Sequence, residues 1–389
     1  MDRAVSWRRP GQFRFALSNG EKNSTPSQAK RCPLLRKEGI MPKKAALTRR
    51  KKNLAVKRAT YPDRVIGFWK EAMRERIDAT RKLAGFPVSR GDCHYHSTYS
   101  DGIGTVAETA AWVAKAGLDF HFITDHWTVR QKVECVKYKN LWWGQEPGTQ
   151  YHHLGILGLD RKYVTERDLV KDYRNVIELG GFPFIPHPTG WFPTTRYSQE
   201  QIDALDLLGD DFTIELINGS NNIFDCYDIT DDMSISLWDR HLSQGKIVRG
   251  MGNTDAHLYQ AIGDVWNGVL LERPTKKKVI DALWAGHFFA SDAPFVNLRC
   301  GKAVMGDVVK KRKGSQVEVR YECADSLGLQ QVRVIANGKV VEDLRPEDKQ
   351  VVKGSFKMKF GGGHAYIRVE CYARDNRKAF SNPIYIRER

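Results

Sequence analysis

The sequence predicts an α/β protein whose strand–helix units form a mostly parallel sheet or barrel, followed by a small β-sandwich. From residue 91 to about residue 290, short apolar runs alternate with stretches of helical periodicity, which is typical of repeated strand–helix units. After residue 295 the helical stretches stop and apolar residues alternate with polar ones, which indicates antiparallel strands. We therefore expect one domain at 61–294 and a second at 295–389.

The first sixty residues carry most of the net charge. The chain of 389 residues has a formal charge of +16, and residues 1–60 contain 17 Lys and Arg but 3 Asp and Glu. Because this tail lacks sustained apolar periodicity, we predict a disordered, solvated extension. Its attachment to nucleic acid or to an anionic surface is the alternative hypothesis. Met41 lies inside the tail and is an alternative start to Met1.

The sequence also bears on the cellular location of the protein and on the roles of its cysteines. The sequence has no apolar run of roughly 18 residues and no apolar signal segment, so we expect a soluble, cytoplasmic protein without a membrane partner. Its 7 cysteines are scattered and include no Cys-x-x-Cys pair. A disulfide framework and a thiolate zinc site are therefore not expected.

Apolar spacing places the individual elements. A helix is expected at 61–85, where apolar residues recur at helical spacing until Gly85. Further helices are expected at 105–116 and 166–179. The expected strands of the first domain include 120–124, 182–186, 212–217, 246–250 and 287–290. In the second domain, Asn337-Gly338 predicts a two-residue hairpin turn.

Four extended segments end in residues that commonly bind metal ions. His94 and His96 stand two apart on one of them, so both imidazoles face the same side, and Asp101 follows across a turn. The other three end in Thr124-Asp125-His126, in His187 and in Asp255-Ala256-His257. Because barrel folds build their sites at the carboxyl ends of strands, we expect these imidazoles and carboxylates to meet.

The order and spacing of these motifs resemble the polymerase-and-histidinol-phosphatase (PHP) metallohydrolases. The shared motifs are a His-x-His run that ends in Ser-Asp-Gly, then Thr-Asp-His, a single strand-end His and a late Asp-x-His, over roughly residues 90–300. The run 238–257 and the closing Phe380-Ser381-Asn382-Pro383 are similar to the carbaryl-hydrolase-like branch. The resemblance implies a distorted (β/α)7, TIM-like barrel followed by an Ig-like β-sandwich.

The resemblance also implies a glutamate and a histidine ligand between the second and third motifs. Glu146 and His153 fit these positions, with His152 as an alternative to His153, and Glu146 would bridge two metal ions. The implied ligand set is His94, His96, Asp101, His126, Glu146, His153, His187, Asp255 and His257. Such a set suits two or three divalent ions of zinc, manganese or iron.

The expected activity is hydrolysis of an ester bond by metal-activated water, with a small phosphorylated molecule as the first substrate hypothesis. Glu146 would support the attacking group, and Asp255 or His257 would move the proton. Arg130 and Arg196 are candidate phosphate-binding residues, with solvated loop arginines as the alternative. Asn218 is a third substrate-binding candidate, and Glu215 is expected to orient ligands beside it.

Two other functions compete with this one. A carbamate or carboxylic ester is the second substrate hypothesis, because an aromatic wall could be formed by Trp127, Trp142, Trp143 and Trp191. Trp127 stands where the family commonly has a small polar residue, which bears on the size of the pocket. A non-catalytic binding protein with a nucleic-acid-binding tail is the third, and it is disfavoured because no ligand of the set is missing. The oligomeric state is not predicted.

Overall fold

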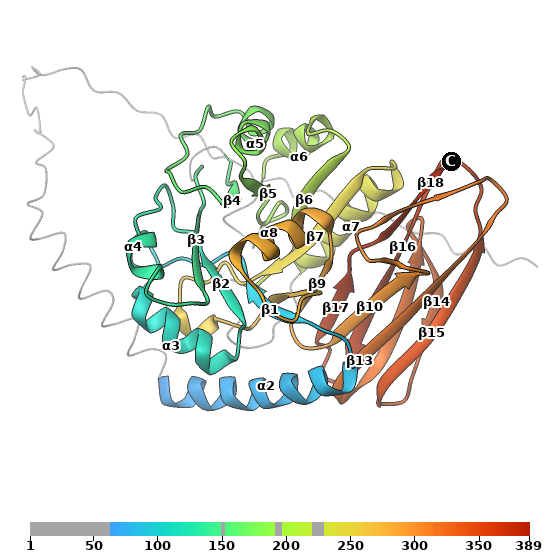
Figure 1. The fold of residues 1–389 in the computed structure, drawn as a ribbon, viewed down its shortest axis with the longest axis horizontal. Helices are drawn as coiled ribbons and strands as arrows, with labels where there is room; N and C mark the ends of the chain where they lie inside the picture. Colours follow the sequence, from blue (N-terminus) through green and yellow to red (C-terminus); the bar gives the residue numbers. More distant parts are fainter. Residues whose placement is uncertain (1–62, 149–151, 191–196, 220–228) are drawn as a thin grey trace, which may run out of the picture. The chain divides into compact units, whose positions relative to one another are not determined.

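The computed structural model describes residues 63–148, 152–190, 197–219 and 229–389. The chain divides into the units Met1–Lys51 and Lys52–Arg389, and every described residue belongs to the second unit. The basic tail at 1–60 lies outside the described residues, so its disorder and its attachment to nucleic acid remain predictions. Helices and strands alternate through the first part of the second unit, and strands alone follow (Figure 1).

The helices of the described residues are α2 (Asp63–Ala84), α3 (Val106–Ala116), α4 (Lys132–Cys135), α5 (Leu169–Glu178), α6 (Gln199–Ala204), α7 (Ile229–Ser243) and α8 (Lys276–Ala285). The strands of the α/β part are β1 (Ser89–Asp92), β2 (Phe120–Ile123), β3 (Leu141–Gln145), β4 (Gly155–Leu157), β5 (Phe182–Phe184), β6 (Asp211–Asn218), β7 (Ile247–Asn253), β8 (Trp266–Val269) and β9 (Phe288–Ser291). The strands that follow are β10 (Phe295–Cys300), β11 (Ala303–Val304), β12 (Val308–Lys311), β13 (Gln316–Ala336), β14 (Lys339–Leu344), β15 (Lys349–Lys359), β16 (His364–Ala373), β17 (Lys378–Ser381) and β18 (Ile384–Glu388).

Local sequence explains where the helices begin and end. At the start of α3, the hydroxyl oxygen of Thr105 accepts the amide of Glu108, and the carboxylate of Glu108 accepts the amide of Thr105. The same helix ends at Gly117, whose φ of 69° is left-handed and favours glycine. Gly286 ends α8 in the same way, with a φ of 71°. These caps set the lengths of the helical connections between strands.

The sheet of the α/β part is mixed, so the prediction of a mostly parallel sheet or barrel holds only in part. β2 runs parallel to β1 and β3, and β6 runs parallel to β7. β4 runs antiparallel to β3 and β5, and β8 runs antiparallel to β1 and β9. No helix of the described residues separates β3 from β4, so the chain turns back directly and an antiparallel pair results. The apolar pattern predicts where strands lie but not their direction.

Strands β1 to β7 are linked neighbour to neighbour, and the last returns to the first. A parallel bridge between Ile185 and Ile214 joins the end of β5 to β6. A second parallel bridge, between Tyr95 and Ala256, joins the segments that continue β1 and β7. The carboxyl ends of β1, β2, β3, β5, β6 and β7, together with the amino end of the antiparallel β4, are thereby brought together at one end of the α/β part.

The strand-only part is organised around the long strand β13. This strand of 21 residues pairs with β10, β14, β15 and β16, all antiparallel. Asn337 and Gly338, with φ of 50° and 74°, form the predicted two-residue turn between β13 and β14. β17 pairs with β9 through Phe380 and Ala290, so the hydrogen-bonded sheet continues from one part into the other.

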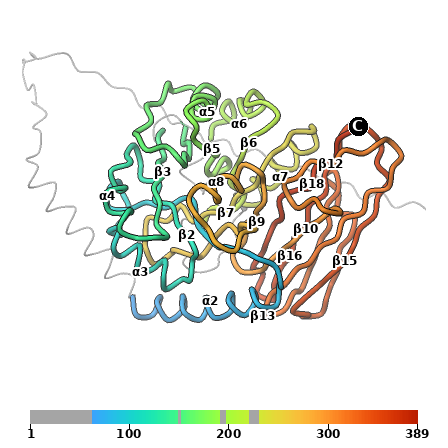
Figure 2. Tube along the Cα trace, in the orientation of Figure 1, coloured from blue at the N-terminus to red at the C-terminus, as the bar shows by residue number. Residues whose placement is uncertain are grey.

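Helix α2 contacts both parts, and it lies where the sequence predicts a helix (Figure 1, Figure 2). Its Arg76 forms a two-pronged ion pair with Asp325 of β13, at 3.0 Å from each carboxylate oxygen. The other guanidinium nitrogen of Arg76 lies 2.6 Å from Asp375. The first turns of α2 expose Phe68 and Trp69.

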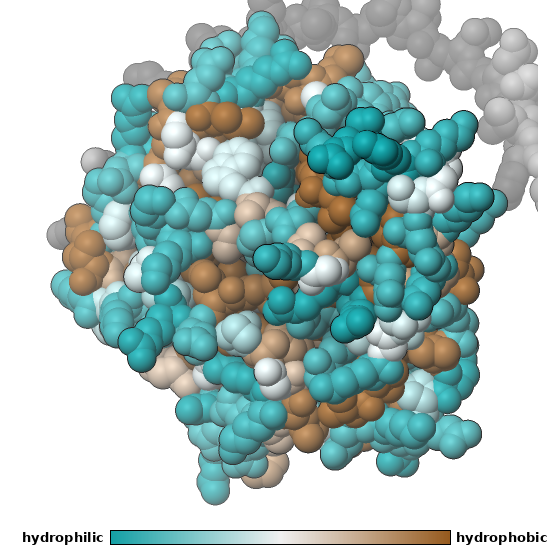
Figure 3. Space-filling view, turned by 45° about the vertical axis from the view of Figure 1, so that its right-hand side comes forward, coloured by the Kyte–Doolittle hydropathy of each residue, from teal (hydrophilic) through white to brown (hydrophobic). Residues whose placement is uncertain are grey.

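On the face shown in Figure 3, hydrophobic residues form small patches separated by hydrophilic ones. In the described part of the chain, no helix is both long and apolar enough to cross a membrane.

Candidate metal centre

The structure brings all nine sequence-predicted ligands together where β1, β2, β3, β5 and β7 end. They form three groups, within each of which the ligand atoms lie within 4.8 Å of one another. We call them the central group (His94, His96, Glu146, Asp255), the lateral group (Glu146, His153, His187) and the open group (His96, Asp101, His126, His257). Glu146 belongs to the central and lateral groups, and His96 belongs to the central and open groups. The three groups are therefore contiguous.

Backbone pairing explains why the first and last motifs lie side by side. The amide of His96 donates to the carbonyl of Ala256 at 2.9 Å, and the amide of Asp255 donates to the carbonyl of His94 at 2.9 Å. A parallel bridge between His126 and Glu146 extends the pairing of β2 with β3 in the same manner. Each motif is thus held by a neighbouring strand end, and its side chains point to a common centre.

The central group has the spacing of the ligands around a single small cation. The Nε2 atoms of His94 and His96 lie 3.2 Å apart. They lie 3.1 and 3.0 Å from Oδ1 of Asp255, and 3.3 and 3.2 Å from Oε2 of Glu146. Bonds of about 2.0–2.1 Å to a tetrahedral ion place neighbouring ligand atoms about 3.3 Å apart. Two nitrogens and two oxygens therefore fit one divalent ion.

Glu146 presents its two oxygens to two different groups. Oε1 lies 2.8 Å from Nδ1 of His153 and 3.3 Å from Nε2 of His187, while Oε2 faces the central group. Glu146 is fully buried, and Oε2 has no hydrogen-bond partner among the described residues. A buried carboxylate oxygen without a donor is costly unless a cation neutralises it. This orientation fits a carboxylate that bridges two ions.

The open group is wider and more accessible than the other two. Oδ2 of Asp101 lies 3.3 Å from Nε2 of His257 and 3.8 Å from Nε2 of His126. The side chain of Asp101 is 56% exposed and that of His257 is 28% exposed, whereas His94 and His96 are fully buried. Solvent and ligands therefore reach the centre from the side of Asp101.

Glu215 of β6 orients the candidate ligands through hydrogen bonds to atoms that do not face the central group. Its Oε1 lies 2.8 Å from Nδ1 of His94 and accepts from the side chain of Asn253 at 2.8 Å. Its Oε2 accepts from the backbone amide of His187 at 2.7 Å and from the side chain of Asn218 at 3.1 Å. A carboxylate can only accept, so Nδ1 of His94 carries the proton and Nε2 keeps its lone pair for the central group.

Two histidines of the open group are oriented by backbone carbonyls in the same way. Nδ1 of His126 donates to the carbonyl of Glu146 at 3.0 Å, and Nδ1 of His257 donates to the carbonyl of Asp255 at 2.9 Å. These bonds leave Nε2 of both rings as the ligand atom. The tautomer of each ring is therefore set by a neighbouring ligand residue.

Two of the ligands have strained backbones. Asp255 has a φ of 47° and His187 a φ of 31°, and both values are unusual for residues with a side chain. Such conformations cost about 1–3 kcal/mol each and persist where the surroundings impose them. Here the amide of Asp255 is held by His94, and the amide of His187 by Glu215. Ligand placement overrides local backbone preference at these two positions.

The ionisable side chains of the three groups strongly shift one another's pKa values. Burial alone lowers the pKa of His96, but the neighbouring carboxylates of Asp255 and Glu146 outweigh it and raise this pKa to about 10. Burial raises the pKa of Glu146, yet His153, His94 and His126 outweigh it and hold that pKa well below the usual range. Protons on the imidazoles thus balance the buried carboxylates, and a bound cation has to replace those protons.

The ambiguity between His152 and His153 is resolved by their partners. His153 belongs to the lateral group, whereas Nε2 of His152 lies 3.0 Å from Oδ2 of Asp172 in α5. Glu134, the other acidic residue near the second motif, accepts the hydroxyl of Tyr99 at 2.6 Å and belongs to none of the three groups.

The predicted substrate-binding residues are dispersed. Asn218 is buried beside the centre and donates to Oδ2 of Asp255 at 3.3 Å as well as to Glu215. Arg130 is exposed in the turn before α4. Arg196 and Trp191 lie outside the described residues.

The predicted aromatic wall is wrong for two of its four tryptophans. Trp142 packs in the core on Phe120, with ring centroids 5.5 Å apart. Trp143 faces the other side of β3, where Nε1 donates to Asp160 at 2.9 Å. Neighbouring residues of a strand point to opposite faces, so two adjacent tryptophans cannot line one wall. Trp127 remains partly exposed next to the ligand His126.

The sequence interpretation missed several residues that hold the motifs in place. Asp125 accepts the amide and the hydroxyl of Ser97 at 2.8 and 2.7 Å, and it accepts the hydroxyl of Ser100 at 2.7 Å. Asp92 accepts the amides of His94 and Thr254 at 3.1 and 3.2 Å, which links the first and last motifs. Each lies within two residues of a predicted ligand, which is the sequence signal that could have identified it.

Comparisons with known proteins give distant likenesses. No family model matches the sequence, and no curated protein matches it. A two-domain protein from Bacteroides vulgatus, described as containing a predicted PHP-like metal-dependent phosphoesterase, is similar to 78% of this chain over 95% of its own, with 16% identity and a TM-score of 0.42. A metal-dependent phosphoesterase from Bifidobacterium adolescentis is similar to 43% of this chain over 87% of its own, with 16% identity and a TM-score of 0.31. An amidohydrolase from Chromobacterium violaceum, with bound sulfate and no metal, is similar to 49% of this chain over 96% of its own, with 13% identity and a TM-score of 0.32. Because these values are low, the function has to be inferred from the side chains of this chain.

Proposed function

We propose that this chain is a metal-dependent hydrolase of the PHP type that cleaves a phosphoester of a small molecule. We further propose that β1 to β7 form its distorted TIM-like barrel, that 295–389 is an Ig-like β-sandwich, and that the chain belongs to the carbaryl-hydrolase-like branch. The observation that carries the proposal is Glu146, whose two oxygens serve two adjoining groups of buried imidazoles and carboxylates.

Each group of side chains would hold one divalent ion of zinc, manganese or iron. The central group offers two nitrogens and two oxygens, and the lateral group offers two nitrogens and one oxygen. The open group is the third site. Ions bound there would lower the pKa of water from 15.7 to about 7 and would stabilise the charge of a departing oxygen.

The residues themselves divide the remaining tasks. Asp101 and His257 are the most exposed members, so an ester substrate approaches from their side. His257 has its Nδ1 committed to a carbonyl, so its Nε2 would accept or return a proton near the entrance when only the central and lateral groups hold ions, and would bind the third ion otherwise. Asp255 and Glu146 are buried anions whose pKa values are held low, and they balance the positive charge of the centre. Glu215 fixes the ring of His94 through the whole reaction.

A carbamate or carboxylic ester is the second candidate substrate. Trp127, partly exposed beside His126, favours it because an indole ring suits an apolar group near the entrance. Its backbone φ of 58° holds the residue in an unusual conformation directly after a ligand.

Metal content and a panel of substrates test the proposal together. The purified protein, never exposed to chelators, is expected to contain at least two divalent ions per chain and to hydrolyse phosphomonoesters or phosphodiesters faster than carboxylic esters. Replacing His94 and His96 together by alanine should remove most of the metal and the turnover, because His96 serves two groups. Fewer than one ion per chain would overturn the multinuclear site. Turnover restricted to carboxylic esters or carbamates would select the second candidate.

A further inference from the structure

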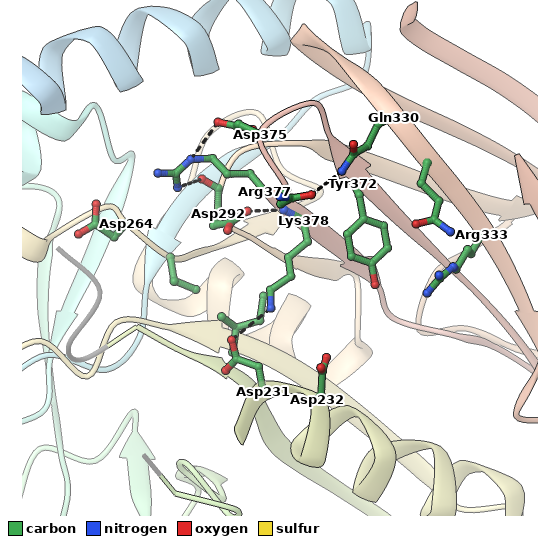
Figure 4. A pocket seen from close by; sticks show the side chains of 14 residues that line it. Asp231, Asp232, Asp264, Asp292, Gln330, Arg333, Tyr372, Asp375, Arg377 and Lys378 are labelled. Carbon is green, nitrogen blue, oxygen red and sulfur yellow. Dashed lines mark hydrogen bonds and ion pairs between the residues drawn. The ribbon is translucent and has the colours of Figure 1, made fainter. Parts of the chain in front are cut away.

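An ion pair connects the strand-only part to the helix next to the metal centre. Lys378, the first residue of β17, places its Nζ 3.3 Å from Oδ2 of Asp231 in the first turn of α7 (Figure 4). The side chain of Asp231 is 5% exposed and that of Lys378 is 19% exposed. A carboxylate this deeply buried needs a partner, because an unpaired buried charge is strongly destabilising.

From Asp231 a short series of contacts leads to the ligands. Oδ1 of Asp231 accepts the backbone amide of Asn218 at 3.2 Å. The side chain of Asn218 donates to Oδ2 of Asp255 at 3.3 Å and to Oε2 of Glu215 at 3.1 Å. The other oxygen of Asp255 faces His94 and His96 in the central group. A series of three contacts therefore links Lys378 to the candidate metal ligand Asp255.

We propose that Lys378 is a positioning residue of the metal centre: by holding Asp231 it fixes Asn218, and through Asn218 it fixes the carboxylate of Asp255. The strand-only part thereby contributes to metal binding without touching the metal. This inference rests on the proposed function, because it takes the central group to be a metal site.

Two features make Asp255 dependent on such support. Its φ of 47° is not a low-energy conformation, so the backbone alone does not hold its carboxylate in place. Its Oδ2 receives the amide group of Asn218 while Oδ1 faces the central group, so a shift of Asn218 rotates the ligand oxygen. Loss of a direct outer partner of a metal ligand typically costs roughly 10–100-fold in metal affinity or activity.

The surroundings fix Lys378 in this role. Its amide donates to Oδ1 of Asp292 at 2.5 Å, and its carbonyl accepts the amide of Asp292 at 3.2 Å, so the backbone is held on both sides. Burial lowers the pKa of Lys378, but Asp231 and Asp292 outweigh it and keep the amine charged. The pair lies at the wall of a cleft of about 610 Å³ that Asp232 and Arg377 also line. None of the nine candidate ligands is among the described residues that line this cleft.

The test replaces Lys378 by methionine, which keeps the length of the side chain and removes its charge. Binding of Mn²⁺ is measured by electron paramagnetic resonance on the full chain, and kcat and KM are measured on a substrate that the wild-type protein hydrolyses. Lys378→Met should weaken Mn²⁺ binding by about three- to tenfold, less than loss of a direct partner. It should lower kcat with little change in KM. Lys378→Arg should restore both.

A matched control removes another lysine of the strand-only part. Lys353 of β15 lies 2.8 Å from Glu322 and has no route to the centre through Asp231, so Lys353→Met should bind Mn²⁺ like the wild type. Asp231→Asn should share the defect of Lys378→Met, and it tests the same ion pair if the methionine variant does not fold. Adding Lys378→Met to Asp231→Asn should cause no further loss, because both changes break one connection.

Either of two results would overturn the inference. The first is a Mn²⁺ dissociation constant of Lys378→Met that lies within twofold of that of Lys353→Met. The second is a loss of affinity in the double variant that equals the product of the losses in the two single variants. A lower thermal midpoint with unchanged Mn²⁺ binding has the same meaning, since it shows a structural role alone. If the wild-type protein binds Mn²⁺ but hydrolyses no ester, the proposed function is wrong, and the dissociation constants still decide the role of Lys378. A wild-type protein that binds no metal overturns both.

Discussion

Replacing Glu146 by glutamine tests the centre at its most connected residue. The change is nearly isosteric, so the fold should persist while one buried negative charge disappears between the central and lateral groups. Two unit charges 4 Å apart interact by about 4 kcal/mol at an effective dielectric constant of about 20. Since about 1.4 kcal/mol corresponds to a tenfold change in a dissociation constant, the loss is about a thousandfold for one ion. A divalent ion in direct contact would lose more.

The assay measures metal content after gel filtration, together with turnover and the thermal midpoint of unfolding. Glu146→Gln should lose at least one ion per chain and nearly all of its turnover while keeping a cooperative unfolding transition. Glu134→Gln is the matched control, because Glu134 accepts a hydrogen bond from Tyr99 and lies outside all three groups. Full metal content and normal turnover in Glu146→Gln would refute the bridging role. Loss in Glu134→Gln alone would move the bridge to that residue.

Three further predictions concern the ligand support, the protons and the tail. Glu215→Gln should weaken metal binding by about tenfold, because the amide nitrogen of glutamine cannot accept the hydrogen bonds that one oxygen of Glu215 accepts. A dissociation constant equal to that of the wild type would contradict this. With a pKa near 10, His96 of the metal-free protein carries a proton that a bound metal ion has to displace. The affinity for the metal should therefore fall as the pH is lowered from about 8 to about 6. A metal affinity independent of pH would show that no proton is displaced. Deleting residues 1–60 should leave the turnover and the thermal midpoint unchanged, and a folded but inactive product would assign the tail a role in catalysis.

Two pairs of candidate ligands could be predicted from short-range geometry, whereas Glu146 and His153 were implied only by the resemblance to the family. Residues two apart on an extended segment face the same side, so the sequence alone is enough to pair His94 with His96. The motif of Asp255 and His257 has the same spacing. The strand-end pattern predicts that these two motifs meet, but it does not predict that the bridge between Tyr95 and Ala256 joins them.

The errors have the same physical origin. The direction of β4 depends on whether a helix intervenes, and the apolar pattern of residues 155–157 is the same for both directions. Trp142 and Trp143 differ by one position, which on a strand decides between the core and the surface. The contact between Asp231 and Lys378 joins residues 147 positions apart, so a sequence pattern could predict neither the pair nor its proximity to the centre.

The pairing of β17 with β9 has a consequence for how the protein is made. Strand β9 completes the sheet of the α/β part on one side, and its own neighbour there is β17, at 378–381. During synthesis the ribosome releases all nine ligands well before it releases this strand. The edge of β9 therefore waits unpaired on the nascent chain, and Asp231 waits without its lysine. The pairing of β9 with β17 and the ion pair of Asp231 with Lys378 are expected to form only after residue 381 has left the ribosome.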